Sequence, residues 1–383
     1  RVLFRSNQTL LTTALPTLMK EFDISASSVQ WLTTGFLLVN GIMIPISAWL
    51  INKFSSKKLY ITAMSTFLIG TIICFVAQDF GMLLTGRLVQ AAGVGVSMPL
   101  LQTIMLSIFP PEKRGAAMGT TGIVIGLAPA LGPTLSGWII DSYTWRDLFG
   151  MVIPIVVLVL ILASFLMKNV IQLSNPSIDV LSVILSTLGF GSLLYGFSSV
   201  GDKGWGSPQV YGFLIVGAIV LCLFTYRQLH LEQPFLELRV FKSKVFTVAA
   251  ILSGVTNMAM IGAEMVLPLY IQNIRGESAF HSGLMLLPGA LVMGLMMPVT
   301  GRIFDKIGAR RLAITGMFIL TAATLPFAFL TKATPIIYII VLYAIRMFGI
   351  SMVMMPVTTS GMNALPMNLL SHGTAVNNTF RQV

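Results

Sequence analysis

The stretch GTTGIVIGLAPALGPTLSGW, residues 119–138, is apolar but carries glycine or proline at regular intervals. A helix turns by about 100° per residue, which places these residues in one stripe that begins at Gly115. In water each interior glycine would cost about 1 kcal/mol, and each interior proline about 3 kcal/mol, relative to alanine. In a bilayer a neighbouring helix can approach such a stripe closely and satisfy the freed carbonyl groups. The stretch therefore predicts a membrane helix that packs against another helix and bends there. A small-residue packing face without a moving role is the alternative. The stripe consists of Gly115, Gly119, Gly122, Gly126, Pro129, Pro133 and Gly137.

The composition of the whole chain agrees with a membrane protein. Of 383 residues, 55% are hydrophobic and only 10% are charged, which excludes an ordinary soluble globule. The net charge of +11 is first a signal of membrane topology, because Lys and Arg concentrate in cytoplasmic loops, and it does not indicate nucleic-acid binding. Cys74 and Cys222 lie in separate apolar runs, so they suggest neither a disulfide framework nor a metal site.

Twelve apolar runs are long enough to span a bilayer, and a thirteenth begins near residue 372. The first run is short for a span and the last is cut off, so we expect a chain truncated at both ends. Five alternate loops hold fourteen Lys or Arg residues, whereas the other loops hold five, which places the basic loops in the cytoplasm. The runs cover residues 2–19, 28–51, 59–78, 81–108, 115–139, 148–168, 178–200, 210–229, 244–272, 279–303, 310–330 and 335–358.

An internal repeat indicates the architecture. A shift of 253 positions aligns Pro45 with Pro298, Lys53 with Lys306, and the basic loop after each. A parallel repeat of this kind predicts two similar halves with the substrate bound between them near the middle of the membrane. Eight helices separate the copies, so the runs at 178–200 and 210–229 are predicted to be an inserted pair.

The two repeated loops carry a candidate gate. An acid at a helix end with cations beyond it can form a charge lock whose partners change as domains move. Residues 301–311 have this pattern, whereas Asn52 replaces the acid in the loop at 52–58, for which we favour a plain positive-inside loop. The candidate gating residues are Lys53, Lys57, Gly301, Asp305, Lys306, Arg310 and Arg311.

Three charged residues lie well inside predicted spans, away from their ends. Two of them are arginines, Arg87 and Arg346, and Gln90 follows Arg87 on the same helix. An arginine in hydrocarbon costs at least about 2.5 kcal/mol, so each should face a partner or a cavity. Glu264 is the only acid that we place inside a span, where burial favours its neutral form and makes a protonation switch possible. The alternative for Arg87 is a structural hydrogen bond to the backbone or a side chain of the first helix, and for Glu264 an interfacial or structurally paired acid.

These motifs resemble those of a known family. The pattern around Gly122, Gly126, Pro129, Gly132, Pro133 and Gly137 resembles the fifth-helix antiporter motif of major facilitator exporters. The segment at 87–95 resembles R-x-x-Q-G-x-G-x-G, whose arginine that family associates with proton transfer, and Arg346 looks like its counterpart in the second half. Residues 7–16 resemble the helix-1 pattern D-x-T-x-x-N-x-A-L-P, except that Asn7 replaces the acid. The chain is therefore similar to the fourteen-helix drug:proton antiporters of the EmrB/QacA type, most closely to their LmrB-like branch.

The resemblance implies an all-α major facilitator fold of two six-helix bundles with two extra linker helices. We expect an N-terminal bundle at 1–170, linker helices at 171–243 and a C-terminal bundle at 244–383. We expect a monomer in the cell membrane that exports amphipathic, drug-like compounds in exchange for protons, with no cofactor beyond the proton gradient and no nucleic-acid partner. The proton and substrate pathway is predicted to include Asn7, Arg87, Gln90, Glu264 and Arg346.

Other functions remain open at this stage. The chain could instead export a lipid or a cell-envelope precursor, or carry a polar metabolite, although the helix-5 motif marks exporters by resemblance. An enzyme is disfavoured, because His230, His281 and His372 are scattered and no paired acids occur within the spans. ATP-driven transport is disfavoured as well, since the sequence has no phosphate-binding G-x-x-x-x-G-K-[ST] loop.

Overall fold

A computed structural model describes residues 14–123, 142–171, 179–277 and 279–382, apart from Pro16, Gln233 and residue 172, together with the isolated positions 132, 138, 139 and 173. Within these residues ten helices are long and apolar enough to cross a membrane. They correspond to ten of the twelve predicted spans, because most of the runs at 2–19 and 115–139 lies outside the described residues. The all-α membrane fold is thus confirmed.

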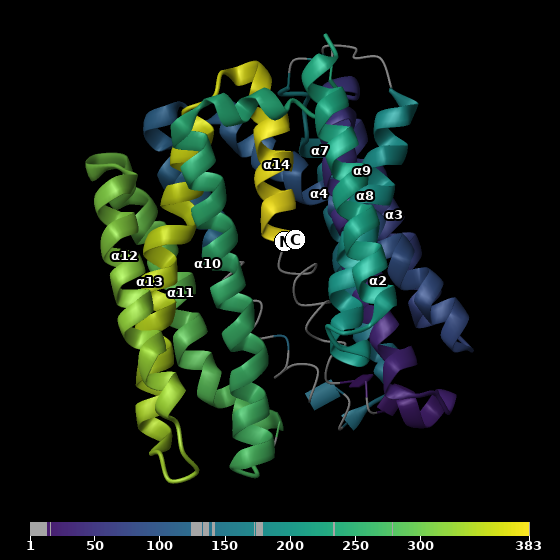
Figure 1. Ribbon diagram of the computed structural model, residues 1–383, viewed down its shortest axis with the longest axis vertical. Helices are drawn as coiled ribbons and strands as arrows, with labels where there is room; N and C mark the ends of the chain where they lie inside the picture. The colour runs from purple at the N-terminus through teal and green to yellow at the C-terminus, as the bar shows by residue number, and fades with distance from the viewer. Residues whose placement is uncertain are drawn as a thin grey trace. The chain divides into compact units, whose positions relative to one another are not determined.

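The helices follow the predicted runs closely (Figure 1). Their ends differ from the prediction by a few residues: α2 and α13 extend past the apolar run, whereas α7 and α12 end before it does. The helices are α2 (Ala26–Lys53), α3 (Ser56–Phe75), α4 (Phe80–Ile108), α6 (Trp145–Gly150), α7 (Val152–Leu166), α8 (Val180–Lys203), α9 (Pro208–His230), α10 (Lys244–Leu269), α11 (Ala279–Ile307), α12 (Ala309–Thr324), α13 (Ile336–Asn363) and α14 (Leu370–Gln382). Short helical turns are η1 (Pro111–Lys113), η2 (Leu238–Lys242), η3 (Tyr270–Ile274), η4 (Leu325–Phe329) and η5 (Met367–Leu369).

The chain divides into two compact units. One contains Arg1–Ala14, Ile108–Thr144 and Lys244–Ala364, and the other contains Leu15–Ser107, Trp145–Ser243 and Leu365–Val383. In the first unit α10, α11 and α12 all pack on α13 or its neighbours, as Figure 1 shows. In the second, α3 packs on α4 and α7, while α2 contacts both α8 and α14. The predicted division into 1–170, 171–243 and 244–383 stays a prediction.

Close glycine contacts support the internal repeat. A Cβ on Gly70 of α3 would lie 2.6 Å from the backbone nitrogen of Gln90 in α4. A Cβ on Gly316 of α12 would lie 2.8 Å from the carbonyl oxygen of Gly349 in α13. Because α3 and α12 occupy equivalent places in the repeat, as do α4 and α13, each half joins this helix pair by backbone approach at glycine.

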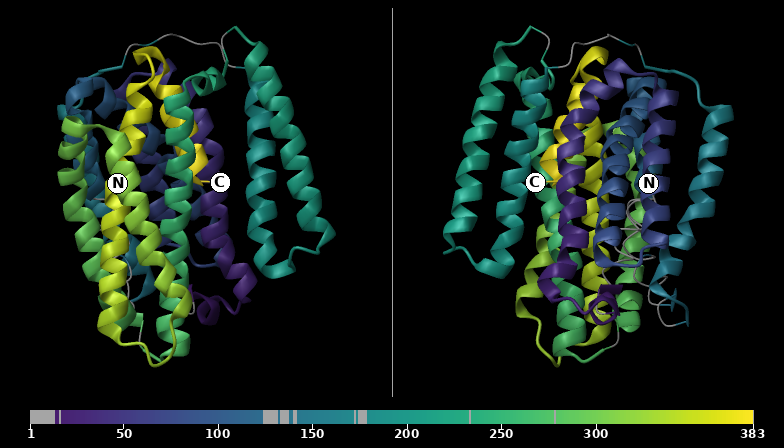
Figure 2. Two further views of the ribbon diagram at one scale, coloured as in Figure 1. Left: turned by 60° about the vertical axis from the view of Figure 1, so that its left-hand side comes forward. Right: turned by 90° about the vertical axis from the view of Figure 1, so that its right-hand side faces the viewer.

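The inserted helices α8 and α9 form an antiparallel pair, seen side by side in Figure 2. Gly189 and Gly217 lie at their contact, where an added Cβ would meet Leu221 and Leu193 at 2.6 and 2.9 Å. At one end of the pair, Arg227 Nε donates to Asp179 Oδ2 over 2.7 Å, and Arg227 Nη2 donates to Oδ1 over 3.0 Å. A two-point contact of this kind fixes the geometry of the pair as well as its charge.

This ion pair predicts a pH dependence for the helix pair. The Arg227 guanidinium lowers the pKa of Asp179 from 3.8 to about 2, despite the opposing effect of burial. The ionised carboxylate therefore stabilises the folded state above pH 4, and this contribution is lost as the pH falls from about 4 to 2. We expect wild type to exceed Asp179→Asn in thermal stability at pH 5, and the difference to close toward pH 2.5. Detergent-phase melting curves measure this, and a pH-independent difference would contradict it.

Polar residues also join α6 to the helical residues 17–22, which precede α2. Glu21 accepts hydrogen bonds from the indole nitrogen of Trp145 and from Arg146 Nη1, the latter at 2.8 Å. Arg146 Nη2 donates to the carbonyl oxygen of Ala77 over 2.9 Å, and its guanidinium lies 4.3 Å from the Trp145 ring centroid. The motif at 145–149 thus joins Glu21 to Ala77, which lies between α3 and α4, within the second unit.

Candidate functional site

Arg87 is a fully buried cation on α4, with 0% of its surface exposed. Its Nη1 donates to Gln90 Oε1 over 2.9 Å, and its Nε donates to the carbonyl oxygen of Leu32 in α2 over 3.4 Å. The guanidinium also lies 4.3 Å from the ring centroid of Phe36. Neutral acceptors and an aromatic face therefore surround the charge. Such partners offset the free-energy cost of placing a charged side chain in the hydrocarbon layer.

Gln90 extends this network into α3. Its Nε2 donates to Thr71 Oγ1 over 2.8 Å, and the Thr71 hydroxyl donates to the carbonyl oxygen of Phe67 over 2.7 Å. Both side chains are 0% exposed. The close approach of α3 and α4 at Gly70 lets these short side chains meet. The structure therefore brings Arg87 and Gln90 into contact. Among the described residues the backbone partner of Arg87 is Leu32 of α2 and not the first helix, so its role in proton transfer stays a prediction.

Arg346 is another buried cation, on α13 in the other unit, with 1% of its surface exposed. Its Nε donates to Thr324 Oγ1 over 3.1 Å, and its Nη2 donates to the carbonyl oxygen of Ala259 in α10. Among the described residues its Nη1 has no hydrogen-bond partner. A buried donor without an acceptor costs about 1–3 kcal/mol, so the site retains an unused capacity to bind an acceptor.

Glu264 belongs to the same site. It lies on α10 about one and a half turns after Ala259, and it interacts electrostatically with both Arg346 and Tyr343 of α13. Tyr343 is 2% exposed, and its ring lies against Gly289 of α11, where a Cβ would clash with it. The structure thus brings together two residues that the sequence predicted separately, Glu264 and Arg346, and adds Tyr343. Asn7 lies outside the described residues.

The described start of the glycine stripe packs against α11. A Cβ on Gly119 would lie 2.6 Å from the carbonyl oxygen of Met297, and one on Gly115 would lie 2.6 Å from that of Gly301. Gly122 likewise faces the Met297 side chain. The predicted close packing on another backbone is therefore present at Gly115 and Gly119, whereas Gly122 packs on a side chain. Gly132 is helical and buried, while Gly126, Pro129, Pro133 and Gly137 lie outside the described residues.

Asp305 binds the start of this same helix. Its two carboxylate oxygens accept from the backbone N–H groups of Gly115 and Ala116, each over 2.9 Å. These amides carry the partial positive charge of a helix N-terminus, which favours an anion there. Lys306, Arg310 and Arg311 are exposed and take part in none of the ion pairs found among the described residues. Their role in a changing charge lock stays a prediction.

Asn52 makes the equivalent contact in the other unit, which the sequence reasoning missed. It stands 253 positions before Asp305 and bonds to the start of α14 through Ser371 and His372, at 2.7 and 3.0 Å. Lys53 ends α2 and Lys57 lies in the first turn of α3. The repeat offset could have revealed this contact, because it aligns Asn52 with Asp305. Both side chains can form hydrogen bonds, although only Asp305 can carry a charge.

Arg114 and Asn363 are further residues that the motifs did not reveal. Arg114 Nη1 donates to Asn363 Oδ1 over 2.9 Å, and Asn363 Nδ2 donates to the carbonyl oxygen of Pro111 over 3.3 Å. The pair joins the end of α13 to the turn before the glycine-rich helix. No group of His, Cys, Asp and Glu suited to a metal ion occurs among the described residues.

Comparison with known proteins agrees with this arrangement. The family model described as "Major Facilitator Superfamily" matches residues 1–383. An uncharacterized MFS-type transporter, YcnB of Bacillus subtilis, is 56% identical over 98% of this chain and 80% of its own length. The lincomycin resistance protein LmrB of Listeria monocytogenes is 46% identical over the same shares. The multidrug export protein EmrB of Haemophilus influenzae is 28% identical over 98% of this chain and 74% of its own length.

Solved structures show the same fold. The proton:xylose symporter XylE matches with a TM-score of 0.70 at 15% identity, covering 100% of this chain and 83% of the symporter. At this identity the likeness concerns the fold alone. The matches confirm the resemblance to EmrB-type and LmrB-like proteins, and they identify a transporter family and not an enzyme family. The chain belongs to the major facilitator superfamily and is a multi-pass protein of the cell membrane.

Proposed function

We propose that this protein exports amphipathic, drug-like compounds in exchange for protons by alternating access. The observation that carries the proposal is the group formed by the partly buried Glu264 with the buried Arg346 and Tyr343, in which Arg346 Nη1 has no hydrogen-bond partner among the described residues. Ionisable residues within a membrane are costly and mark ion or substrate pathways. With Asn7 unable to take up a proton, Glu264 is the acid that this pathway requires.

The chemistry of the site provides a two-state element. When ionised, Glu264 attracts the Arg346 guanidinium, and its protonation removes this attraction. Arg346 then relies on Thr324, the Ala259 carbonyl group and its unused Nη1 position. A change in proton occupancy therefore changes the preferred contacts between α10 and α13, which is what coupling to a conformational cycle demands.

The direction of transport and the substrate class rest on other support. By resemblance, the motif that begins at Gly122 marks exporters, and the start of the glycine stripe, at Gly115, Gly119 and Gly122, packs closely on α11. The names of LmrB and EmrB record lincomycin resistance and multidrug export for those relatives. We extend a drug-like substrate to this chain on that basis, with the protein acting as a monomer driven by the proton gradient alone.

The first test replaces the proposed proton carrier. We expect Glu264→Gln to reduce proton-driven efflux of ethidium in everted vesicles by about tenfold or more, since a coupling energy of 1–3 kcal/mol is lost. Arg346→Gln should act similarly, whereas Glu112→Gln, on an exposed turn, should transport like wild type. An uncoupler should abolish wild-type efflux. Undiminished efflux by a well-folded Glu264→Gln variant would remove Glu264 from the mechanism.

The same efflux assay distinguishes a drug-like substrate from the alternative substrates. If wild type neither exports ethidium nor responds to a proton gradient, the drug substrate is wrong, and a lipid or cell-envelope precursor becomes the leading candidate. The fold and the buried site would be unaffected by that result.

A further inference from the structure

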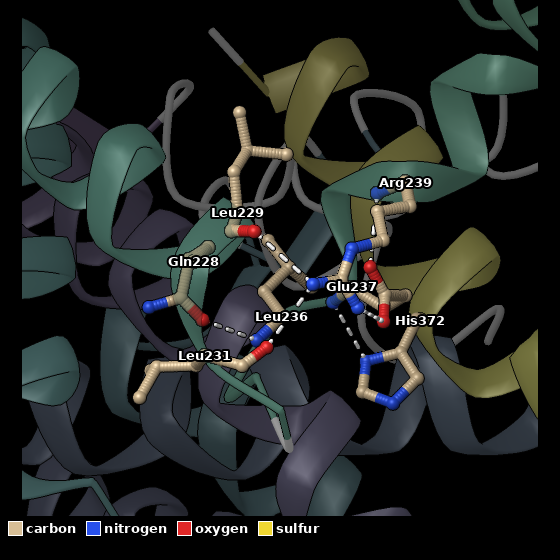
Figure 3. Close-up of polar contacts among 7 residues, drawn as sticks. All are labelled: Gln228, Leu229, Leu231, Leu236, Glu237, Arg239 and His372. Atoms are coloured by element: carbon tan, nitrogen blue, oxygen red, sulfur yellow. Dashed lines mark hydrogen bonds and ion pairs between the residues drawn. The ribbon is translucent and has the colours of Figure 1, made fainter.

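The segment that follows the inserted helix pair, residues 231–243, is fastened to α9 by several hydrogen bonds (Figure 3). Gln228 Oε1 accepts from the backbone nitrogen of Leu236 over 3.0 Å. Arg239 Nη2 donates to the carbonyl oxygens of Leu229 and Leu231 over 3.1 and 3.2 Å, which occupies groups left free at the end of α9. The segment therefore returns along the end of the helix that it leaves.

The same segment reaches α14 through one ring. The backbone nitrogen of Glu237 donates to His372 Nδ1 over 3.2 Å, and Figure 3 shows this ring facing Glu237 from α14. On its other side, His372 Nε2 lies 3.0 Å from the Asn52 amide at the end of α2. Ser371 lies 2.7 Å from Asn52 as well. One histidine thus joins the connecting segment, α14 and α2.

The backbone donor decides the state of this ring. Since Glu237 N–H can only donate, Nδ1 must accept and therefore carries no proton. A neutral ring then holds its proton on Nε2, which faces Asn52 Nδ2, while Ser371 Oγ lies against Asn52 Oδ1. Because two donors cannot bond to each other, we assign the amide the opposite orientation, in which Oδ1 accepts from Nε2 and Nδ2 donates to the Ser371 hydroxyl. All three contacts are satisfied together in this arrangement.

Several side chains of the segment at 231–243 are buried, which distinguishes it from a flexible connection. Phe235, Leu236 and Val240 are each at most 2% exposed, and Gln228 is 0% exposed. Gln228 Nε2 also donates to Ser182 of α8, so both inserted helices are tied to the segment. A continuous set of packed and hydrogen-bonded groups therefore runs from α8 and α9 to α14 and α2.

We propose that residues 231–243 couple the inserted helix pair to the contact between α2 and α14, with His372 as the joint. The inference rests on the proposed alternating-access function, because the contact must open for the coupling to matter in transport. It assigns the inserted pair a mechanical role: its position favours the state in which Asn52 and His372 are in contact.

A matched pair of substitutions separates the two sides of the joint. In His372→Asn the side-chain oxygen can take the place of Nδ1 and accept from Glu237, while the contact with Asn52 is lost. In His372→Gln the longer amide can reach Asn52 but leaves the Glu237 N–H without its acceptor. In the protein in nanodiscs, without substrate or gradient, we expect amide exchange at residues 236–240 to be about fivefold to tenfold faster in the Gln variant. The Asn variant should stay within about twofold of wild type at these amides. Equal rates in both variants would overturn the role of His372.

A second comparison tests transmission from the helix pair. Gln228→Ala removes one of the hydrogen bonds that hold the segment to α9 and should speed exchange at residues 370–376 of α14, although the Gln228 bonds go to Ser182 and Leu236 and not to α14. Gln209→Ala, at the opposite end of the same helix, should leave those amides unchanged. Unchanged exchange in the Gln228 variant would reduce the segment to a plain connection. If wild type shows no proton-driven efflux but the exchange differences appear, the transport proposal fails and the coupling by residues 231–243 stands. If efflux is present but the exchange differences are absent, the coupling proposal fails and the transport proposal stands.

Discussion

Replacing Gly119 with valine is expected to abolish transport and to destabilise the protein by more than about 3 kcal/mol. A Cβ at this position would lie 2.6 Å from the Met297 carbonyl oxygen and 2.9 Å from Pro298 Cα, both backbone atoms of α11. Backbone atoms cannot turn aside as a flexible side chain can, so the helices must separate. Overpacking of this kind costs about 1–3 kcal/mol for smaller additions, and valine adds three carbons. Melting temperature in detergent and efflux in vesicles measure the two effects.

Graded and matched controls make the result specific. The melting temperature and efflux of Gly119→Ala should fall between those of wild type and Gly119→Val. One added carbon causes a clash, but a smaller one than the three carbons of valine. Gly212→Val on α9 introduces the same group where nothing lies within 4 Å, and it should leave efflux unchanged. A Gly119→Val protein with wild-type stability would show that the stripe tolerates bulk and has no close-packing role.

Arg87→Ala should have the second-largest effect. The substitution removes a fully buried guanidinium and leaves Gln90 Oε1 and the Leu32 carbonyl group without this donor. Unsatisfied buried groups cost about 1–3 kcal/mol each, and the cavity adds to this. We expect a lower melting temperature together with loss of proton-driven efflux per folded molecule.

A double-mutant cycle separates structure from transport for this residue. Gln90→Ala alone should destabilise by a similar mechanism, and the double variant should lose less than the sum of the two, because both act in one network. Arg87→Lys keeps the charge but lacks the planar fork that serves two acceptors, so it should restore little stability. If Arg87→Lys transported normally per folded molecule, the charge alone would suffice and the hydrogen-bond geometry would be unimportant.

The candidate site was only partly predictable from the sequence. Arg87, Glu264 and Arg346 were found because a charge in an apolar run is costly wherever the helix lies. Their partners were not found, since Leu32, Thr324 and the Ala259 carbonyl group are ordinary residues that acquire a role only by position. Tyr343 was missed for the same reason. An aromatic residue in an apolar helix gives no signal until an acid is known to lie near it.

Hydropathy and motif spacing predicted the membrane class, the ten described spans and the family, because both are local properties that do not depend on tertiary contacts. The repeat at 253 positions also predicted that Asn52 and Asp305 hold equivalent places. What those places contact follows from the folded chain alone: the amides of Gly115 and Ala116 for Asp305, and Ser371 and His372 for Asn52. A hydrogen bond acts over about 3 Å between residues that can lie hundreds of positions apart, so the packing of the helices selects its partner.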